Sequence, residues 1–408
     1  MNLWGAETVS QFGSQITPVA IPLLAALTLD ATPFEMGILA AASGLPVLVI
    51  GFVAGAWVDR LRRRPLMIAM DMGRAIALLT IPFAAWLDVL SISLLMIVSV
   101  VTGMQTVIFN AAYASLLPNL VGRSDLADAN GKLYTSMSVS QVAGPALTGT
   151  LIAIVSAPVV LLIDSLSFLV SSVFLSRIRH KEARDPGSRT GGHFWREVRE
   201  GLHALVSSPV LRAVTASSAT INLAGYLFLS VYVLYMTGDL GLSATGVGFV
   251  YAAGGVGSLL GSLVARPISE RFGVGPTLVW SAVGFGAFGL TVPLAILVPA
   301  YALPLVIFAE CMQWMALIVF NVIKLSLRQA LTPDRLMGRV SASSQVLIGG
   351  MMPVGSVLGG TIGSLFGVQA ALLVGCAGML LAAAWVWWSP VIAIREMPAG
   401  PESGEGAE

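Results

Sequence analysis

Four acidic residues lie within long apolar stretches of the sequence, where an ionised carboxylate is expensive. They are Glu7, Asp71, Asp164 and Glu310. A charged side chain at the centre of a membrane-spanning helix costs about 2.5–3.5 kcal/mol on insertion scales. Because burial favours the neutral form of a carboxyl group, an acid in such a place can exchange a proton near neutral pH. These residues therefore indicate proton chemistry inside an apolar environment.

Glu310 and Asp164 are the candidates for taking up and releasing a proton. Glu310 lies near the middle of its apolar stretch, and Gln313 and Trp314 follow it at helical spacing. A carboxyl group that is protonated at one membrane face and deprotonated at the other can use a proton gradient. The alternative for both acids is a hydrogen-bonded or protonated carboxyl group that only packs two helices. Glu7 lies near the end of its stretch and can simply be hydrated.

A short polar segment, Gly51–Arg64, interrupts the apolar pattern with the sequence GFVAGAWVDRLRRR. The four-residue spacing of Gly51 and Gly55 allows two membrane helices to approach closely. Asp59 is then followed by a dense arginine cluster. Such a cluster between two apolar spans places its loop on the cytoplasmic side. The segment therefore predicts a short cytoplasmic loop between two packed helices.

Composition indicates the same class of protein. Of the 408 residues, 56% are hydrophobic and only 11% are charged, whereas a soluble domain carries about 25% charged residues. A helical span needs about 20 apolar residues, and twelve such stretches can be counted, from Leu3–Leu29 to Gln369–Trp388. The sequence therefore predicts an all-α polytopic membrane protein with twelve transmembrane helices.

Basic residues are distributed asymmetrically between the predicted loops. With the amino terminus inside the cell, all 22 Lys and Arg residues fall on inside loops, the tail or the helix ends that face them. The outer connections carry only acids, such as Asp30 and Asp239. Positively charged loops stay on the cytoplasmic side of a membrane. Both termini are therefore predicted to be cytoplasmic.

The chain repeats itself at an offset of 206 residues. Glycines recur at this offset in four pairs: Gly51 with Gly257, Gly55 with Gly261, Gly144 with Gly350, and Gly149 with Gly355. A repeat of six spans predicts two parallel, pseudo-symmetric six-helix bundles, residues 1–176 and 209–390.

Two polar segments complete the predicted organisation. Residues 177–208 form a cytoplasmic central loop, in which HFWREVREGLHALV predicts an amphipathic helix on the inner membrane surface. This loop either tethers the two bundles or acts as a regulatory hinge. Residues 391–408 form a polar cytoplasmic tail.

The motifs of several enzyme classes are absent from the sequence. There is no GxxxxGK[ST] for a nucleotide-driven pump, and neither HExxH nor GxSxG for a hydrolase. Cys311 and Cys376 both lie in apolar runs, where packing is a better explanation than a disulfide or a metal pair. We therefore expect a protein that is not an enzyme and that needs no cofactor or metal.

The residues Gly55, Asp59, Arg60 and Arg64 have the spacing of the loop 2–3 signature of the major facilitator superfamily. The chain resembles this superfamily along its whole length. The DxxR pair Asp71 and Arg74, together with the segments LLPNLVGRSDLADANG and LTPDRLMGRV, is similar to the branch that contains bacterial macrolide and siderophore exporters. The resemblance implies the major facilitator fold.

A second signature lies in the fifth predicted span. It resembles the drug/proton antiporter motif of the superfamily and comprises Gly131, Ser140, Gly144, Pro145, Thr148 and Gly149. Ser140 and Thr148 replace two glycines of that motif, and both are small. The resemblance implies antiporter-like helix packing at Gly131, Gly144, Pro145 and Gly149.

The resemblance also implies a cytoplasmic gate. This latch would comprise Gly55, Asp59, Arg60, Arg64, Asp71 and Arg74. It would hold the two halves together in one state and release them in the other. The alternative is a static role in orienting the loop. Ala265 stands where the second repeat would carry the equivalent of Asp59, so the latch would be single and asymmetric.

Polar amides recur near the middle of spans 1, 4, 7 and 10, which line the central cavity in the superfamily. The candidates for a substrate cavity are Gln11, Gln15, Gln105, Asn222, Tyr226, Gln313 and Trp314. The alternative is interhelical hydrogen bonding, which contributes about 0.6 kcal/mol on average. A cavity with few charges and several aromatic rings suits a bulky, partly apolar compound.

These features together predict a secondary active transporter of the inner membrane that works by alternating access. The expected activity is proton-coupled efflux of a drug-like or siderophore-like compound. Proton-coupled import of a small nutrient and a non-transporting scaffold or sensor remain alternatives. The expected partners are the lipid bilayer, a small-molecule substrate and protons. We expect a monomer that binds no nucleic acid.

Overall fold

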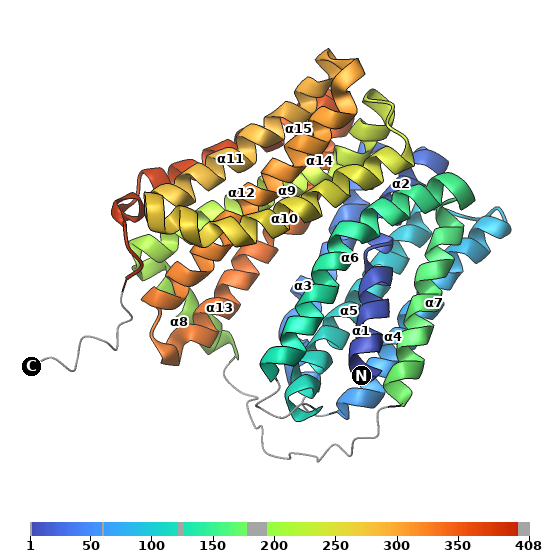
Figure 1. Ribbon diagram of the computed structural model, residues 1–408, viewed down its shortest axis with the longest axis horizontal. Helices are drawn as coiled ribbons and strands as arrows, with labels where there is room; N and C mark the ends of the chain where they lie inside the picture. Colours follow the sequence, from blue (N-terminus) through green and yellow to red (C-terminus); the bar gives the residue numbers. More distant parts are fainter. Residues whose placement is uncertain (1, 59–60, 121–125, 178–193, 399–408) are drawn as a thin grey trace, which may run out of the picture. The chain divides into compact units, whose positions relative to one another are not determined.

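The computed structural model describes residues 2–58, 61–120, 126–177 and 194–398. Figure 1 shows that these residues form helices joined by short connections. The chain divides into two compact units. Unit 1 comprises Met1–Gly191 and Met236–Ala252, and unit 2 comprises Gly192–Tyr235 and Ala253–Glu408.

The helices of unit 1 follow one another along the first half of the chain. They are α1 (Asn2–Ser14), α2 (Thr17–Thr28), α3 (Pro33–Val58), α4 (Arg63–Trp86), α5 (Ile92–Leu120), α6 (Leu126–Val155) and α7 (Ala157–Ser176). Helix α10 (Ala244–Phe272) contributes its first residues to this unit. Within it, α3 packs on α5, and α4 packs on both α5 and α7.

Unit 2 contains the remaining helices and the rest of α10. They are α8 (Phe194–Ser207), α9 (Pro209–Leu234), α11 (Val274–Leu294), α12 (Ala302–Leu331), α13 (Asp334–Gly349), α14 (Met351–Phe366) and α15 (Val368–Trp387). A π-helical turn (Tyr235–Asp239) extends α9, and short 3-10 turns cover Ala295–Leu297, Pro299–Tyr301 and Pro390–Ala393. Helix α9 packs on α14 and α15, and α11 packs on α12 and α15.

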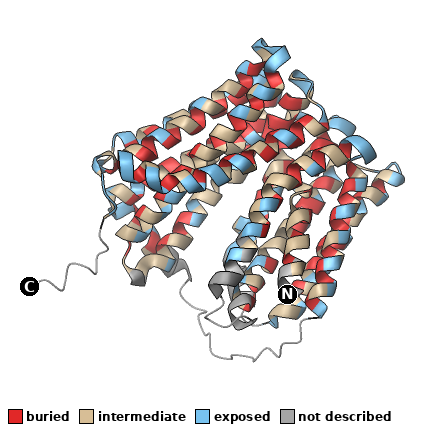
Figure 2. Cartoon of the chain, in the orientation of Figure 1, coloured by how far each residue is buried: buried red, intermediate tan, exposed pale blue. Residues whose placement is uncertain are grey.

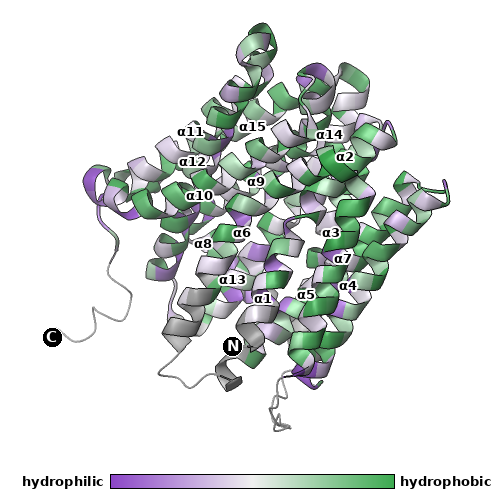
Figure 3. Ribbon diagram, turned by 45° about the vertical axis from the view of Figure 1, so that its right-hand side comes forward, coloured by the Kyte–Doolittle hydropathy of each residue, from purple (hydrophilic) through white to green (hydrophobic). Residues whose placement is uncertain are grey.

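Eleven helical segments among the described residues are long and apolar enough to cross a membrane. In a bilayer every backbone polar group must find its partner within the protein, and a helix achieves this within one segment. Figure 3 shows hydrophobic residues along most of the length of these helices. The all-helical architecture of a multi-pass membrane protein therefore follows directly from the apolar composition.

The first predicted span, Leu3–Leu29, is divided into two helices. Helix α1 has 13 residues and α2 has 12, so neither reaches the length of a span alone. The second position of α2 is Pro18, which has no backbone N–H to donate to the preceding turn. Because of this break, the sequence contains one more apolar stretch than the described residues contain helices long enough to span a membrane.

Large apolar side chains remain exposed on the outer faces of the helices. On α4, Ile76, Phe83 and Trp86 are exposed, the last to 77%, whereas Leu78 and Ile81 of the same helix are fully buried. Figure 2 shows this alternation of buried and exposed residues along the helices. Contiguous apolar exposure is unfavourable in water and expected against lipid.

Helix α8, which belongs to the central loop, packs against the other helices of unit 2. Leu205 is buried with Leu211 of α9 and Val340 of α13. Glu200 accepts an ion-paired hydrogen bond from Arg339 of α13. On an adjacent side of α8, Leu202 and Val206 are exposed. The amphipathic pattern of this segment is therefore used for packing on α13 as well as for an exposed apolar face.

Glycines let α14 approach α9 closely. A methyl group at Gly355 would clash with the carbonyl oxygen of Leu223, and one at Gly359 would clash with that of Leu227. Both obstacles are backbone atoms, which cannot move away as a flexible side chain can. The small residues therefore set the distance between the two helices.

We predict that Gly355→Ala lowers the stability of the protein by about 1–3 kcal/mol, because the two backbones must separate. The matched control is Gly338→Ala on α13, where no atom lies within 4 Å of the added methyl group. Because alanine favours a helix over glycine by about 1 kcal/mol, this control should be neutral or stabilising. Thermal unfolding of both purified variants in detergent measures the difference. Equal unfolding temperatures would contradict the close-approach argument.

Candidate functional site

Unit 2 contains a cavity of about 230 Å³ between helices α9, α11, α12 and α15. Its polar lining groups include Asn222 and Tyr226 of α9, and Glu310, Gln313 and Asn321 of α12. Both helices present one face to the cavity, since their lining residues recur at intervals of three and four positions. The cavity is therefore a consequence of two facing helical stripes.

Glu310 is the acidic residue of the cavity lining, and it is only 2% exposed. The Tyr232 hydroxyl of α9 donates to its Oε2 at 2.9 Å. The Trp314 indole Nε1, one turn further along α12, donates to its Oε1 at 2.7 Å. Both carboxylate oxygens thus have a neutral donor. A buried carboxyl group held in this way is positioned without a permanent counter-charge.

Two of the three amides that line the cavity, Gln313 and Asn222, are held by hydrogen bonds that they donate. Gln313 Nε2 donates to the carbonyl oxygen of Phe285 on α11 at 3.2 Å. Asn222 Nδ2 donates to the carbonyl oxygen of Ser218 at 3.0 Å. The side-chain oxygen of each of these two amides accepts no hydrogen bond from the described residues. It can therefore still accept one from a bound molecule.

Aromatic rings supply much of the cavity wall. They are Tyr226, Phe228, Tyr232, Phe285 and Trp314. Sequence reasoning singled out Tyr226 and Trp314 but not the other three. Tyr232 lies ten residues after Asn222, which is about 80° short of three helical turns, so the spacing along α9 was only a weak signal for it. Phe285 carries no comparable signal, since tertiary packing alone brings α11 to this place.

Unit 1 contains a second buried polar cluster, built around Arg74 of α4. Arg74 forms an ion pair with Asp71 three residues earlier, and the two residues are 3% and 0% exposed. The guanidinium carbon lies 4.4 Å from the ring centroid of Phe109 on α5 and 4.3 Å from that of Phe168 on α7. Two aromatic faces and one carboxylate therefore compensate the buried charge.

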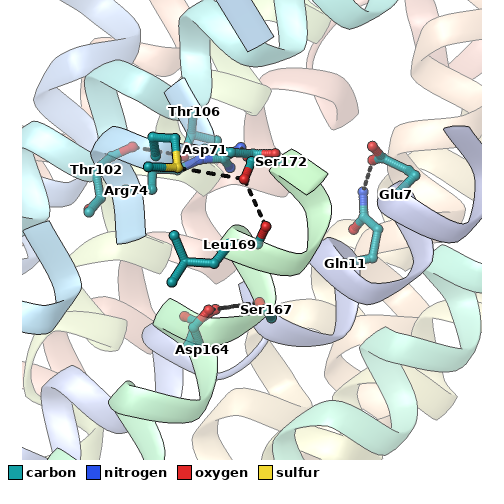
Figure 4. Close-up of polar contacts among 11 residues, drawn as sticks. Glu7, Gln11, Asp71, Arg74, Thr102, Thr106, Asp164, Ser167, Leu169 and Ser172 are labelled. Atoms are coloured by element: carbon teal, nitrogen blue, oxygen red, sulfur yellow. Dashed lines mark hydrogen bonds and ion pairs between the residues drawn. The ribbon is translucent and has the colours of Figure 1, made fainter. Parts of the chain in front are cut away.

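Two further buried acids lie in unit 1, and Figure 4 shows Glu7 beside Gln11 and Asp164 beside Ser167, whose hydroxyl donates to it at 3.3 Å. Gln11 Nε2 donates to Glu7 on the preceding turn of α1 at 2.7 Å. Asp164 of α7 is fully buried and accepts from the Thr17 hydroxyl at 2.5 Å. Thr17 is the first residue of α2, so the carboxylate lies at the break between α1 and α2. The positive end of α2 favours an acid at this position.

The remaining amides predicted for the cavity lie in unit 1 against glycines. A methyl group at Gly73 of α4 would clash with the amide of Gln105 on α5, and one at Gly144 of α6 would lie 2.5 Å from Cβ of Gln15. Gln11, Gln15 and Gln105 therefore belong to unit 1, whereas Asn222, Tyr226, Gln313 and Trp314 come together around Glu310 in unit 2.

The residues of the fifth-span motif differ in their surroundings. Gly149 and the Pro145 carbonyl of α6 lie against Gly248 of α10, where an added methyl group would clash with the backbone. At Gly131 of the same helix no described atom lies within 4 Å of an added methyl group.

Only part of the predicted latch can be placed. Asp59 and Arg60 lie outside the described residues, and Gly55 lies within α3. Arg64, in the first turn of α4, donates from Nε to the carbonyl oxygen of Leu175 at 2.8 Å and from Nη2 to that of Ser176. These are carbonyl groups at the C-terminus of α7, where a cation is favourable. Arg64 therefore joins α4 to α7.

The arrangement offers two chemically distinct sites. The cavity of unit 2 can surround a small molecule with aromatic rings, amides and one carboxyl group. The cluster of unit 1 holds three acids with a single arginine. No group of three or more potential metal ligands occurs among the residues that the structure describes.

We predict that Asp71→Asn lowers the free energy of unfolding by about 3–5 kcal/mol, because it leaves the buried Arg74 without its carboxylate. The matched control is Glu270→Gln on α10, which removes the acid of an exposed ion pair with Arg266. Exposed pairs contribute little, so this control should unfold at the wild-type temperature. Thermal unfolding in detergent compares Asp71→Asn with this control. An unchanged unfolding temperature for Asp71→Asn would show that the pair adds no stability.

Comparisons with known proteins place the chain in a family. The family model described as "Transmembrane secretion effector" matches residues 1–402. The uncharacterised MFS-type transporter YfiS of Bacillus subtilis (strain 168) is 27% identical over 391 residues, which cover 92% of this chain and 89% of the relative. The multidrug efflux pump Tap of Mycolicibacterium fortuitum is 25% identical over 384 residues, covering 90% of each chain.

A solved structure shows the same fold. The crystal structure of a bacterial homologue of the iron transporter ferroportin, in its inward-facing state, superposes with a TM-score of 0.76. The two sequences are 16% identical, and the alignment covers 95% of this chain and 97% of that one. A match between so few identical residues concerns the fold alone. Together with the match of the family model, it shows that the chain is a transporter of the major facilitator superfamily and belongs to its transmembrane secretion effector family.

Proposed function

We propose that the protein is a secondary active transporter that exports a bulky, drug-like or siderophore-like compound in exchange for protons. It would work by alternating access between two six-span halves, residues 1–176 and 209–390. It would lie in the bacterial inner membrane as a monomer, with both termini in the cytoplasm.

The observation that carries the proposal is the cavity around Glu310. Its wall combines aromatic rings with a few polar groups, which is typical of sites for organic molecules. Its lining contains one carboxyl group and no basic residue. A partly apolar compound can therefore be held by ring contacts and by the amides of Asn222 and Gln313, without a fixed ion pair.

The surroundings of Glu310 support a role in proton coupling. When the carboxylate is ionised, Tyr232 and Trp314 both donate to it. When it is protonated, its own hydroxyl becomes a donor and its oxygens become weaker acceptors, so the two hydrogen bonds weaken or the one with Tyr232 reverses. Tyr232 belongs to α9 and Trp314 to α12. Proton binding at Glu310 therefore changes a contact between the two helices that form the cavity.

Two observations support export as the direction. The multidrug efflux pump Tap is similar to this chain along almost its whole length. The fifth-span motif, with Gly144, Pro145 and Gly149, resembles that of drug/proton antiporters.

Asp164 at the break between α1 and α2 is a second candidate for carrying a proton, because it is fully buried and accepts hydrogen bonds from neutral groups.

We predict that Glu310→Gln abolishes gradient-driven transport while leaving substrate exchange intact. Glutamine keeps the size and an acceptor oxygen of the side chain but cannot gain or lose a proton near neutral pH. Proteoliposomes with an imposed pH gradient, tested with a panel of dyes, macrolides and siderophores, measure this and identify substrate and direction together.

The matched control for this experiment is Glu270→Gln, which changes an exposed acid of the same unit. It should transport at the wild-type rate. Full gradient-driven transport by Glu310→Gln would remove this residue from the coupling mechanism. A wild-type protein that moves no compound of the panel in either direction would overturn the proposed function itself.

The loop at Asp59 is proposed to act as the cytoplasmic latch, together with Gly55, Arg60, Arg64 and the pair Asp71–Arg74. We predict that Asp59→Asn slows transport without reducing the amount of protein inserted in the membrane. The transport rate in proteoliposomes tests the first part of this prediction. The yield of purified protein tests the second part. A wild-type rate in the variant would refute the latch.

A further inference from the structure

The face of α12 that lines the cavity continues past it to two cations. Glu310, Trp314 and Asn321 line the cavity, and Lys324 and Arg328 follow at the same helical spacing. Lys324 Nζ donates to Oδ1 of Asn321 at 2.6 Å, so the two regions are directly joined. At a rise of about 1.5 Å per residue, Arg328 lies about 27 Å from Glu310 along the helix.

The two cations line a shallow depression at the end of unit 2 where α9 begins and α12 ends. Helix α9 contributes Leu211 and Ser218 to it, and α13 contributes Ser344. The depression has a volume of about 10 Å³, which is room for about one water molecule. A ligand would therefore lie over it and place a single oxygen atom inside.

Neither cation has a carboxylate partner among the residues that the structure describes. Lys324 Nζ lies 5.7 Å from the ring centroid of Phe320, and its hydrogen bond goes to the neutral amide of Asn321. Arg328 Nε is buried and has no hydrogen-bond partner within the described part of the chain. Like charges one helical turn apart repel each other, so the pair is unfavourable as it stands.

A neutral donor in the same depression also lacks a partner. The hydroxyl of Ser344 forms no hydrogen bond with any residue that the structure describes, although Ser344 is only 1% exposed. An unsatisfied buried hydroxyl or guanidinium N–H costs about 1–3 kcal/mol. Among the described residues, Arg328 and Ser344 thus each have a donor without an acceptor, and Lys324, which lines the same depression, donates to a neutral amide. This combination indicates a missing anionic acceptor.

The other charged groups around this depression do not supply that acceptor. Arg212 of α9 is a further cation, and it donates to the carbonyl oxygen of Val206. Arg339 of α13 is paired with Glu200 of α8. A purely topological role would place Lys324 and Arg328 in water, as Arg271 is at the end of α10, but both are half-buried. Topology alone therefore does not explain their position.

We propose that Lys324, Arg328 and Ser344 bind an oxyanion of the phosphate type. A guanidinium group, an ammonium group and a hydroxyl together match the oxygen atoms of such a group. The phosphate can belong to a soluble ion or to the headgroup of an anionic phospholipid. The site does not depend on which compound is transported, because its donors lie outside the cavity lining around Glu310.

The test measures thermal unfolding of the purified full-length protein in two settings. In detergent, inorganic phosphate is titrated against sodium chloride at constant ionic strength. In nanodiscs, phosphatidylcholine alone is compared with phosphatidylcholine containing phosphatidylglycerol. A ligand that binds the folded state raises the unfolding temperature. Lys324→Gln and Arg328→Gln should each raise the half-saturating concentration about tenfold, as expected for the loss of one charge-assisted hydrogen bond.

Two matched variants control the experiment. Lys324→Arg keeps the charge and should retain the stabilisation, which separates lost binding from misfolding. Arg271→Gln removes an exposed cation from the same unit and should respond as the wild type does. Without ligand, Lys324→Gln should unfold at or above the wild-type temperature, since it relieves the repulsion from Arg328.

The arms of the experiment distinguish the sources of the phosphate. Stabilisation by inorganic phosphate that depends on Lys324 and Arg328 assigns the site to soluble oxyanions. Stabilisation by phosphatidylglycerol alone, with the same dependence, assigns it to a lipid headgroup. No stabilisation in either setting, or equal stabilisation of the wild type and both glutamine variants, would overturn the proposal.

Discussion

Compensation of buried charge is the constraint on which the polar sites of this protein depend. An ionised side chain among apolar helices is costly unless a partner is held close to it. Arg74 has Asp71 and the rings of Phe109 and Phe168. Each partner comes from α4, α5 or α7, so satisfying one guanidinium group requires three helices to pack in one arrangement.

The acids are held in a different way, by neutral donors. Glu310 accepts from Tyr232 and Trp314, and Asp164 accepts from Thr17. Such donors orient a carboxyl group but do not fix its charge, whereas the ion pair of Asp71 with Arg74 does. This contrast separates residues suited to exchanging a proton from residues suited to holding helices together.

Close helix packing is the second structural requirement, and glycine satisfies it where two backbones meet. Gly355 and Gly359 lie against backbone carbonyl groups of α9, and Gly149 lies against α10. The break between α1 and α2 interrupts the regular helix and leaves backbone groups beside Asp164 without helical partners. Irregular backbone within membrane-spanning segments is tolerated only where protein groups surround it.

Much of the candidate site was predictable from residue type and helical spacing. Glu310, Gln313, Trp314, Asn222 and Tyr226 are polar or amphipathic residues in apolar stretches, and the structure gathers all five around one cavity. The prediction failed to find Tyr232, Phe228 and Phe285. These residues have ordinary apolar or aromatic surroundings in the sequence, and only the packing of α9 and α11 on α12 gives them a role.

The sequence by itself determined the class of protein, because apolar composition and the placement of arginines follow from the cost of exposing polar groups to lipid. It also determined which residues carry unusual chemistry, since a charge in an apolar stretch is visible without a structure. Only the tertiary structure decided which partners these residues have. Partnership depends on helix rotation and on contacts between residues far apart in the chain, such as Tyr232 with Glu310, and spacing along one helix does not encode them.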